Sequence, residues 1–484
     1  MKRLILCVGI ILLSFFSIKA QYSGPFRTNF YDPDTLPRPF KAFVMSQIPD
    51  WTIFGVNRYL QKVDFAFING NTITKNFMFT ALWDNDLFGT NLLAHPIHGS
   101  MDYSGARASG MNYWMSFPYV FGASLVWEMV LENEPAAFND QIATSVGGMA
   151  LGEAFYRISA SVFDNRAHGI GRVAREFIGT VFSPMQGINR MITGEMWKRG
   201  HYPAATPENT FPIEFGTDLS ARYLRVLGNN GAQRVTPYFK FWMNYGDPFR
   251  SYNRRPFDAF TFNIEFDLGS KGNLLSNLEV CGLLKGYILD SKEDTKKMWG
   301  WFQHYRYMDN DALRTDSVSS IRYAQPASVG VGYLSTKEFP NGGHFKNESY
   351  ANVIILGAAH ASYFYLKGRD YNFGQGYGFT QKNELAFNKR IRIGLNLDFI
   401  QLFVWEGYKK GTVVKEQDPE TFRAMGDRGN MIISMIKPYF EFRFTEHLTV
   451  GIESNLFIQF NNNAQFNNST YKFNDTKLGI KYSY

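Results

Sequence analysis

The sequence is short of cysteine and of charge. It holds two cysteines in 484 residues, and charged side chains make up 19% of it, below the roughly 25% that is usual in soluble proteins. Cys7 lies in the first twenty residues and Cys281 stands alone beyond them, so we expect no internal disulfide and no cysteine-based metal site. The formal net charge of +7 is mild, and it predicts neither nucleic acid nor a strongly acidic partner.

Common catalytic motifs are missing as well. The sequence has no phosphate-binding loop, no nucleotide fingerprint and no Gly-x-Ser-x-Gly elbow, so no cofactor is assigned. Apolar side chains are plentiful, with 45% hydrophobic and 17% aromatic residues. This content excludes a disordered chain, and a mean hydropathy of −0.24 excludes a bundle of membrane helices.

Residues 1–20 have the pattern of a secretory signal peptide. Lys2 and Arg3 precede an apolar run over residues 4–16, and Ala20 offers a small residue for cleavage. A membrane anchor is the alternative, but the run is too short to span a bilayer comfortably. An exported chain without disulfides is typical of the bacterial envelope.

Three regions of different composition follow. Residues 21–62 form a leader whose prolines, at 25, 33, 37 and 39, predict extended backbone and not helix. Residues 63–205 show helical spacing of Gly, Ala, Met and aromatic side chains and are interpreted as a small helical block. Residues 206–484 alternate apolar and polar side chains with a period of two.

The alternation in residues 206–484 predicts strands. Segments 260–268, 391–399, 436–444 and 448–460 each place apolar residues on one face and polar residues on the other. Each is about 9–11 residues long, which is the length that a tilted strand needs to cross a bilayer. We count about twelve such strands, and single-chain bacterial barrels have an even number.

A soluble β-sandwich shares this alternation, but a transmembrane barrel explains more. The signal peptide, the strand lengths and the aromatic residues near strand ends all favour the barrel. The last strand ends on Tyr484 and resembles the C-terminal signal that the barrel-assembly machinery reads. The predicted fold is therefore mainly β: an antiparallel transmembrane β-barrel of about 12 strands, preceded by a small α-helical block, in the outer membrane of a Gram-negative bacterium. Its expected partners include outer-membrane lipid and that machinery.

Three helices are expected in the block, and the third covers residues 171–182. Residues 108–127 carry no charge and are long enough to span a bilayer, but Gly110, Pro118 and Gly122 favour a helix or broken helix packed against protein. A second helix is expected from Asp140, a suitable N-cap, to about residue 163. Thr144, Gly148 and Gly152 recur every four residues along it, and this spacing lets two helices approach closely.

A set of polar, aromatic and glycine residues in and around these helices forms one pattern. It reads Trp83-Asp84-x-Asp86, His95-Pro96-x-x-Gly99, Tyr103, Arg107, Trp127-Glu128, Asp140, Gly148, Gly152-Glu153, Arg175 and Asn189-Arg190. This pattern resembles the bacterial envelope family catalogued as domain of unknown function 3943. The resemblance implies a helical block followed by an outer-membrane barrel, and it implies no chemistry.

The polar residues of the block allow several readings. His95 and His98, with Asp84, Asp86, Asp102 and Glu128 near them in sequence, could hold a divalent metal. Because Pro96 argues against a regular helix with both imidazoles on one face, we assign no metal and expect a capped turn. A lipid-modifying enzyme would use His95 or His98 as a base, with Glu128 and one of Ser100, Ser104 or Ser109.

A structural role for these charges is the main interpretation. Buried carboxylates at Glu128, Asp140 and Glu153 need partners, and five arginines could supply them: Arg107, Arg157, Arg172, Arg175 and Arg190. We therefore predict an ion-pair network that holds the block to the barrel.

The lumen-facing positions carry charges of both signs. Such a mixture favours ion pairs with a segment inserted in the lumen over a filter that selects ions of one sign. These positions are Lys240, Glu265, Asp267, Arg392, Asp398, Glu441, Arg443, Glu453 and Lys481. We expect the block on the periplasmic side or in the lumen. The predicted role is a structural or accessory subunit of an envelope assembly or transport complex, with a possible envelope protein partner. A small-solute channel and a lipid-modifying outer-membrane enzyme are the alternatives.

Overall fold

The computed structural model describes residues 28–29, 37–78, 82–84, 86–200, 210–228, 233–250, 255–270, 273–310, 321–361, 363, 369–404, 406–408 and 426–484. The expected signal peptide, residues 1–20, and most of the leader up to residue 36 lie outside the described residues.

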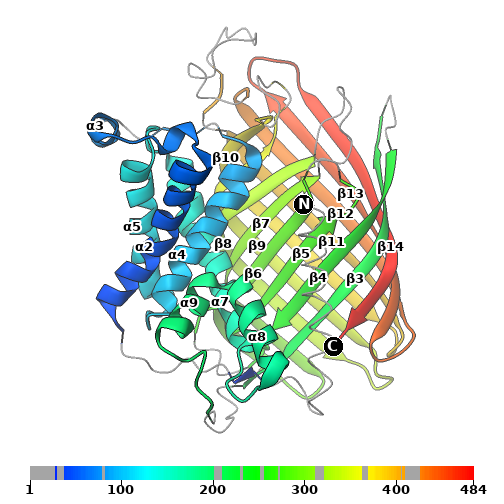
Figure 1. The fold of residues 1–484 in the computed structure, drawn as a ribbon. Coiled ribbons are helices and arrows are strands. Elements are labelled where there is room, and N and C mark those ends of the chain that lie inside the picture. The colour runs from blue at the N-terminus through cyan, green and yellow to red at the C-terminus, as the bar shows by residue number, and fades with distance from the viewer. Residues whose placement is uncertain are drawn as a thin grey trace.

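Twelve antiparallel strands close into a barrel (Figure 1). Each strand pairs with its neighbour in the chain, and the last pairs with the first. The predicted barrel of about twelve strands is thus confirmed. In chain order the strands are β3 (Ile213–Val226), β4 (Gln233–Tyr245), β5 (Phe260–Asp267), β6 (Leu275–Ser291), β7 (Thr295–Asn310), β8 (Ile321–Glu338), β9 (His344–His360), β10 (Tyr371–Ala386), β11 (Ile391–Val404), β12 (Gly429–Arg443), β13 (Leu448–Asn463) and β14 (Ser469–Ser483).

The two ends of the barrel differ in their connections. At the end where β14 finishes, β6–β7, β8–β9, β10–β11 and β12–β13 are joined by short turns. We call this the short-turn end and the opposite one the long-loop end, where β11 and β12 are 24 residues apart, from 405 to 428. A short two-stranded sheet of β1 (Thr28–Asn29) and β2 (Thr210–Phe211) lies outside the barrel sheet.

Period-two alternation separates the two faces of the wall. On β11 the side chains of Ile393, Leu395, Leu397 and Phe399 are exposed, whereas Asp398 between them is buried. Apolar residues thus face outward, toward lipid, and polar residues face the lumen, as transmembrane barrels require.

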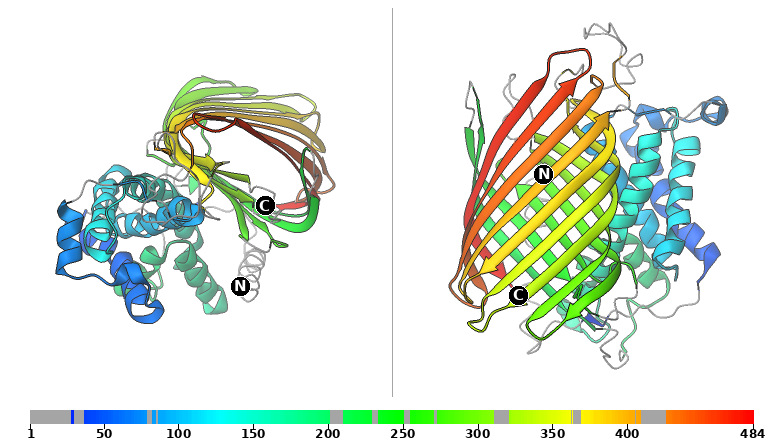
Figure 2. Two further views of the ribbon diagram at one scale, coloured as in Figure 1. Left: turned by 90° about the horizontal axis from the view of Figure 1, so that it is seen from above. Right: turned by 180° about the vertical axis from the view of Figure 1, so that it is seen from behind.

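The helical block runs from α2 to α9 beside the barrel (Figure 2). Its segments are α2 (Pro39–Gly55), η2 (Val56–Gln61), η3 (Asp64–Ala66), α3 (Gly70–Met78), η4 (Thr90–Ala94), α4 (His95–Arg107), α5 (Tyr113–Val126), η5 (Trp127–Leu131), α6 (Phe138–Ile142), η6 (Ala143–Gly147), α7 (Gly148–Val162), α8 (Gly169–Phe182) and α9 (Pro184–Ile192). None of the described helices combines the length and the apolar content needed to cross a membrane.

The block packs on the outside of the barrel wall, so the expected position in the lumen is wrong. Tyr305 on β7 donates to the carbonyl oxygen of Leu92 at 2.8 Å, and Phe155 on α7 contacts Phe262 on β5. Tyr305 alternates with Arg306, whose guanidinium points into the lumen. The helices lie against one part of the outer wall (Figure 2), and they cover apolar side chains there that would otherwise meet lipid.

The expectation of extended backbone in the leader is also wrong for residues 39–61, which form α2 and η2. Pro39 stands in the first turn of α2, where a missing N–H breaks no helical hydrogen bond. Pro49 lies inside the helix and cannot donate to the carbonyl of Met45. Gly105 of α4 comes so close to that carbonyl that a Cβ there would lie 2.4 Å from its oxygen.

The first two expected helices exist, but each begins at a different residue from the one predicted. Residues 113–126 form α5, which Asn112 caps by accepting a hydrogen bond from the Met115 N–H at 2.9 Å. The second helical stretch begins at Phe138, and Asp140 is in its first turn instead of capping it. Its carboxylate accepts from the Asn139 side chain at 2.7 Å and is not available to the backbone.

The small residues Thr144, Gly148 and Gly152 let two helices approach closely, as predicted, and these helices are α7 and α4. A Cβ on Gly148 would lie 2.5 Å from the carbonyl carbon of Gly99, and one on Gly99 would lie 1.9 Å from the Thr144 oxygen. Gly152 meets the ring of Tyr103 in the same way. Glycine at these positions lets the two backbones touch.

Candidate functional site

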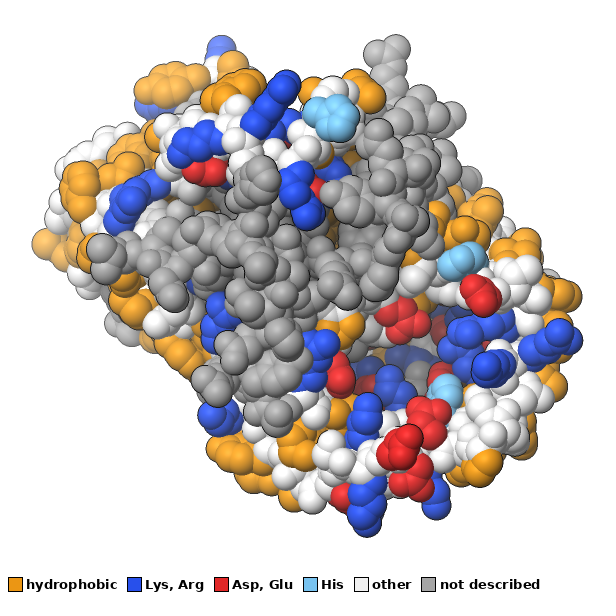
Figure 3. Space-filling view, turned by 90° about the horizontal axis from the view of Figure 1, so that it is seen from below, with side chains coloured by type: hydrophobic (Ala, Val, Ile, Leu, Met, Phe, Trp, Pro, Cys, Tyr) orange, Lys and Arg blue, Asp and Glu red, His pale blue; other side chains and the backbone are white. Residues whose placement is uncertain are grey.

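The lumen is polar toward the short-turn end, where its charges pair with one another. Arg306 Nη1 on β7 lies 2.7 Å from Asp398 Oδ1 on β11, and Lys477 on β14 lies 3.2 Å from Glu265 on β5. Neither pair joins neighbouring strands, so these side chains meet inside the barrel. Figure 3 shows positive and negative side chains together around a hollow at this end.

The predicted lumen residues take part in this network, with the exception of Arg443, whose buried Nε has no hydrogen-bond partner among the described residues. Lys240 lies 3.5 Å from Glu265, and Glu441 accepts from both Arg392 at 2.9 Å and Lys481 at 2.6 Å. The remaining links are Asp267–Arg222, Asp267–Arg234, Glu453–Lys477 and Asp398–Lys437. The barrel therefore neutralises its own charges without an insert.

Toward the long-loop end the lumen is filled by apolar side chains. Inward-facing residues of β3, β7, β8, β9, β11, β12, β13 and β14 form one buried cluster, which we call the apolar layer. It contains Leu224, Met308, Ile321, Tyr323, Ile354, Ala359, Ile400, Leu402, Met431, Ile433, Met435, Phe457 and Phe473. Ile354, Leu402 and Ile433 have no exposed surface.

A hydrogen bond also crosses the lumen at the apolar layer. The Gln459 side chain on β13 donates to the backbone oxygen of His360 on β9 at 2.6 Å, and Asn461 donates to the same oxygen at 3.1 Å. The His360 ring packs edge-on against Tyr471 of β14. Three strands lie between β9 and β13, so strands that are a third of the way round the barrel from each other are in direct contact here.

In the block, Glu153 is the centre of a buried ion cluster. Arg107 Nε and Arg157 Nε lie 2.7 Å and 2.8 Å from its two carboxylate oxygens, and Tyr103 donates to it at 2.9 Å. Burial alone would raise the pKa of Glu153, but the two guanidinium groups outweigh burial and lower that pKa to about 2. Glu153 is therefore ionised at neutral pH.

The same cluster joins the block to the barrel. Arg157 donates to Asp258 Oδ1 at 3.1 Å and to the carbonyl oxygen of Pro256 at 2.8 Å, and both acceptors lie in the connection between β4 and β5. Tyr113 of α5 donates to Gln303 of β7. Of the carboxylates expected in the ion-pair network, Glu153 is joined to Arg107 and Arg157, whereas Glu128 and Asp140 form no ion pair with an arginine within the described residues.

A second buried cluster brings together His95, Glu128 and Asp140. Nε2 of His95 lies 3.6 Å from Asp140 Oδ1, and Glu128 accepts from the Ala137 N–H at 2.8 Å. Burial, followed by the nearby Asp140 charge, raises the pKa of Glu128 to about 8. Burial and the charges of Asp84 and Asp86 also raise the pKa of Asp140.

Three π-helical turns surround this second cluster. The turn η4 ends at Ala94, directly before His95, while η5 holds Trp127 and Glu128. The turn η6 holds Thr144, whose hydroxyl lies 3.4 Å from His95 Nδ1. Such turns occur often at functional sites. Sequence reasoning missed them because a single π-helical turn inside an α-helix is too short to leave a periodic pattern.

The remaining residues of the family pattern hold segments of the block in place. Asn139 accepts from the Asp84 N–H at 2.7 Å, and Asp84 accepts from the Asp86 N–H at 3.1 Å. Trp127 donates to Glu132 at 3.0 Å. Arg175 donates to the Val162 carbonyl at 3.2 Å and so ties α8 to α7, and Arg190 joins α9 to α8 through Glu176 at 2.7 Å. The Asn189 carbonyl accepts from the Thr193 N–H at 2.9 Å, at the end of α9.

No nucleophile–base pair forms around the two histidines within the described part of the block. Ser100, Ser104 and Ser109 each donate to a carbonyl of their own helix, at 2.6, 2.6 and 2.9 Å. Pro96 stands in the first turn of α4 and does not break it, so the expectation of a capped turn there is wrong. His95 and His98 both lie on α4 but have different partners, Asp140 and Asp50.

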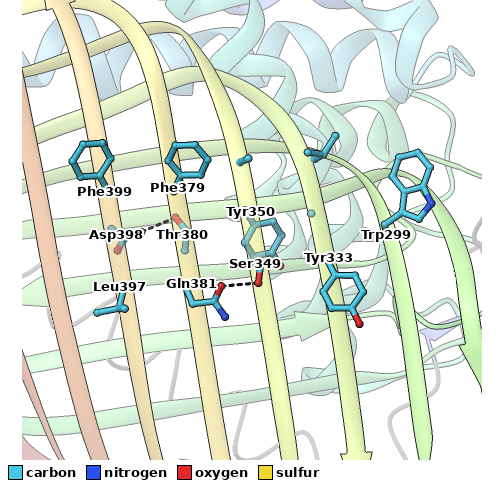
Figure 4. Close-up of a pocket in the computed structure, with 13 residues that line it drawn as sticks. Trp299, Tyr333, Ser349, Tyr350, Phe379, Thr380, Gln381, Leu397, Asp398 and Phe399 are labelled. Atoms are coloured by element: carbon cyan, nitrogen blue, oxygen red, sulfur yellow. Dashed lines mark hydrogen bonds between the residues drawn. The ribbon is translucent and has the colours of Figure 1, made fainter.

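A shallow groove of about 510 Å³ lies on the wall across β7 to β11 (Figure 4). Aromatic side chains line most of it, among them Trp299, Tyr333, Phe379 and Phe399. These four are exposed on the outer face of the barrel. The groove therefore offers apolar contact to lipid and few polar partners to a solute.

A closed twelve-stranded barrel with an apolar outer wall and a polar lumen defines the class: the chain is an outer-membrane β-barrel protein. Residues 80–185, within the helical block, match the family described as "Domain of unknown function (DUF3943)". The block of this outer-membrane protein carries that domain, in agreement with the resemblance drawn from the sequence.

Solved structures share the barrel at low sequence identity. The outer membrane channel DcaP of Acinetobacter baumannii is 11% identical, with 59% of this chain and 99% of that chain covered and a TM-score of 0.26. OmpT of Vibrio cholerae is 8% identical, with 59% and 100% covered and a TM-score of 0.23, and the NanC porin is 7% identical, with 55% and 98% covered and a TM-score of 0.27. No curated protein matches the sequence.

Proposed function

We propose that this outer-membrane barrel is a structural or accessory subunit of an envelope assembly and that its lumen does not conduct solutes. The apolar layer carries the proposal. A conducting pore needs a continuous path of water. Here Ile354, Leu402 and Ile433 are fully buried in the lumen, and the Gln459 side chain forms a hydrogen bond across the lumen to β9. The barrel then serves as a membrane anchor.

The block is the part that such an anchor would present. Its inner side is fixed to the barrel through Arg157, Tyr113 and Tyr305. Its outer side exposes large apolar residues that no described segment covers: Trp51, Trp114, Phe121, Phe177 and Trp197. Large exposed apolar patches mark protein–protein or membrane interaction sites, and of these two occupants we infer that a second envelope protein binds there.

Extraction of native outer membranes in mild detergent tests this role. We expect a complex of fixed stoichiometry that is larger than the 55.5 kDa chain. The double substitution Trp114→Glu with Phe121→Glu should release the partner, because a charge at each position opposes apolar contact. Trp114→Phe, which keeps the apolar surface, is the matched control.

A lone monomer near the mass of the chain would contradict the accessory role. The folding of each variant is checked by the heat-dependent shift of the barrel on a gel, so that loss of the partner is not confused with loss of the barrel.

A further inference from the structure

One cluster in the block is used by neither the ion-pair network nor the barrel. Asp50 on α2 faces His98 and Asp102 on α4, and one donor atom of each lies within 4.8 Å of the other two. Within the described residues this is the one group of three or more His, Cys, Asp or Glu side chains with such a spacing.

The packing of α2 on α4 creates the cluster. His98 and Asp102 are four residues apart on α4 and share one face of that helix. The close approach of Gly105 to the Met45 carbonyl brings the two helices together and places Asp50 opposite them. His98 Nε2 then lies 2.7 Å from Asp50 Oδ1.

Within the described chain the buried Asp102 carboxylate has no partner for its charge, and the partner of the buried Asp50 carboxylate is the His98 imidazole. Asp50 and Asp102 have no exposed surface, and neither oxygen of Asp102 accepts a hydrogen bond within the described chain. No described Lys or Arg forms an ion pair with either carboxylate, although arginines serve Glu153 and Glu176 nearby. Burying such charges is unfavourable unless a cation or hydrogen bonds compensate.

We propose that Asp50, His98 and Asp102 bind a divalent transition-metal ion such as Zn²⁺. One imidazole nitrogen and two carboxylate oxygens are ligands that zinc accepts at about 2.0–2.2 Å. The cation supplies the positive charge that compensates the two buried carboxylates. Three protein ligands leave a fourth position for water.

The Trp127 ring gives the site a local reporter. Its centroid lies 4.9 Å from that of the His98 ring, edge to face. A metal ion on Nε2 of His98 changes the charge and orientation of the imidazole beside this indole. Metal binding should therefore change the fluorescence of the wild-type chain and leave that of Trp127→Phe much less altered.

The test uses the full chain, purified in detergent, stripped with a chelator and titrated with Zn²⁺, with Mn²⁺ as the comparator. We expect one Zn²⁺ per chain. His98→Asn and Asp102→Asn should weaken binding by at least about 10–100-fold, the loss that even an indirect partner of a metal ligand causes. His95→Asn, on the same helix but paired with Asp140, should bind as the wild type does.

A second readout separates binding from misfolding. Asp102→Asn removes an uncompensated buried charge, so without metal it should unfold at a higher temperature than the stripped wild type, and Zn²⁺ should no longer raise its midpoint. Equal Zn²⁺ binding by the wild type, His98→Asn and Asp102→Asn would overturn the proposal, as would a folded wild type that takes up no ion. Neither result bears on the closed lumen, because the site lies outside the barrel.

Discussion

Arg306 on β7 donates to Asp398 on β11, with 2.7 Å between Nη1 and Oδ1, although three strands separate them around the wall. Thr380 donates to the same carboxylate oxygen at 2.7 Å, and Lys437 approaches the other at 3.4 Å. Asp398 is thus held from three strands at once. The pair braces opposite parts of the barrel just below the apolar layer.

Asp398→Asn should destabilise the barrel. The substitution leaves the buried Arg306 guanidinium without its anionic partner, and removing one member of a buried ion pair costs about 3–5 kcal/mol. Unfolding by urea in detergent measures this free energy. Asp290→Asn, in an exposed pair with Lys292, should change stability by less than about 0.5 kcal/mol. Similar losses for the two variants would show that the cross-lumen pair has no special role.

Glu153→Gln should loosen the block and leave the barrel intact. Arg107 and Arg157 would both lose their carboxylate, although Arg157 would keep its contacts with the β4–β5 connection. Limited proteolysis should cut the variant block at least about tenfold faster, while the barrel keeps its heat-dependent shift on a gel. Glu195→Gln, in an exposed pair with Lys198, is the control, and equal cutting rates would refute the prediction.

Gly148→Ala should separate α7 from α4. The new Cβ would lie 2.5 Å from the backbone of Gly99, so one helix must move, and overpacking of this kind costs about 1–3 kcal/mol. Gly122→Ala on α5 is the matched control, because nothing lies within 4 Å of its Cβ position and alanine favours a helix by about 1 kcal/mol. Thermal unfolding of the block should move in opposite directions for the two variants.

The stability of the block should fall as pH rises toward 8. The pKa of Glu128 is raised from 4.5 to about 8 in the folded block, so folding favours the protonated form. Its contribution is complete below about pH 4.5 and is lost as pH rises through 8. Glu128→Gln, whose amide oxygen can still accept from Ala137, should flatten this dependence in unfolding experiments between pH 5 and pH 8. If block stability depended on pH as steeply in Glu128→Gln as in the wild type, Glu128 would not be the source of that dependence.

The twelve strands could be predicted because lipid and lumen impose opposite polarity on alternate residues. The covered part of the wall could not be predicted in the same way. The first half of β8 is buried on both faces, and its alternation is lost where Ala324 and Ala327 meet the block. Small residues there, and Ala358 on β9, are a signal that a strand has protein on its outer side.

The apolar layer left a similar signal. Residues 431–436 of β12 are apolar at all but one position, so both faces of that half-strand are apolar, whereas a wet lumen would demand polar residues on one of them. The prediction of a polar lumen rests only on the charged positions, which lie toward the short-turn end. In the block, the prolines of the leader concealed α2, and Asp50 was therefore absent from the predicted groups around His98.

Conductance in planar lipid bilayers tests the closed lumen most directly. The purified wild-type barrel should give no conductance above that of the bare bilayer, because the apolar layer and the Gln459–His360 contact block the path. The variant with Ile433→Ser and Phe457→Ser, which makes the layer polar and smaller, should open steps of current. Stable channels from the wild type, unchanged in size by these two substitutions, would contradict the account.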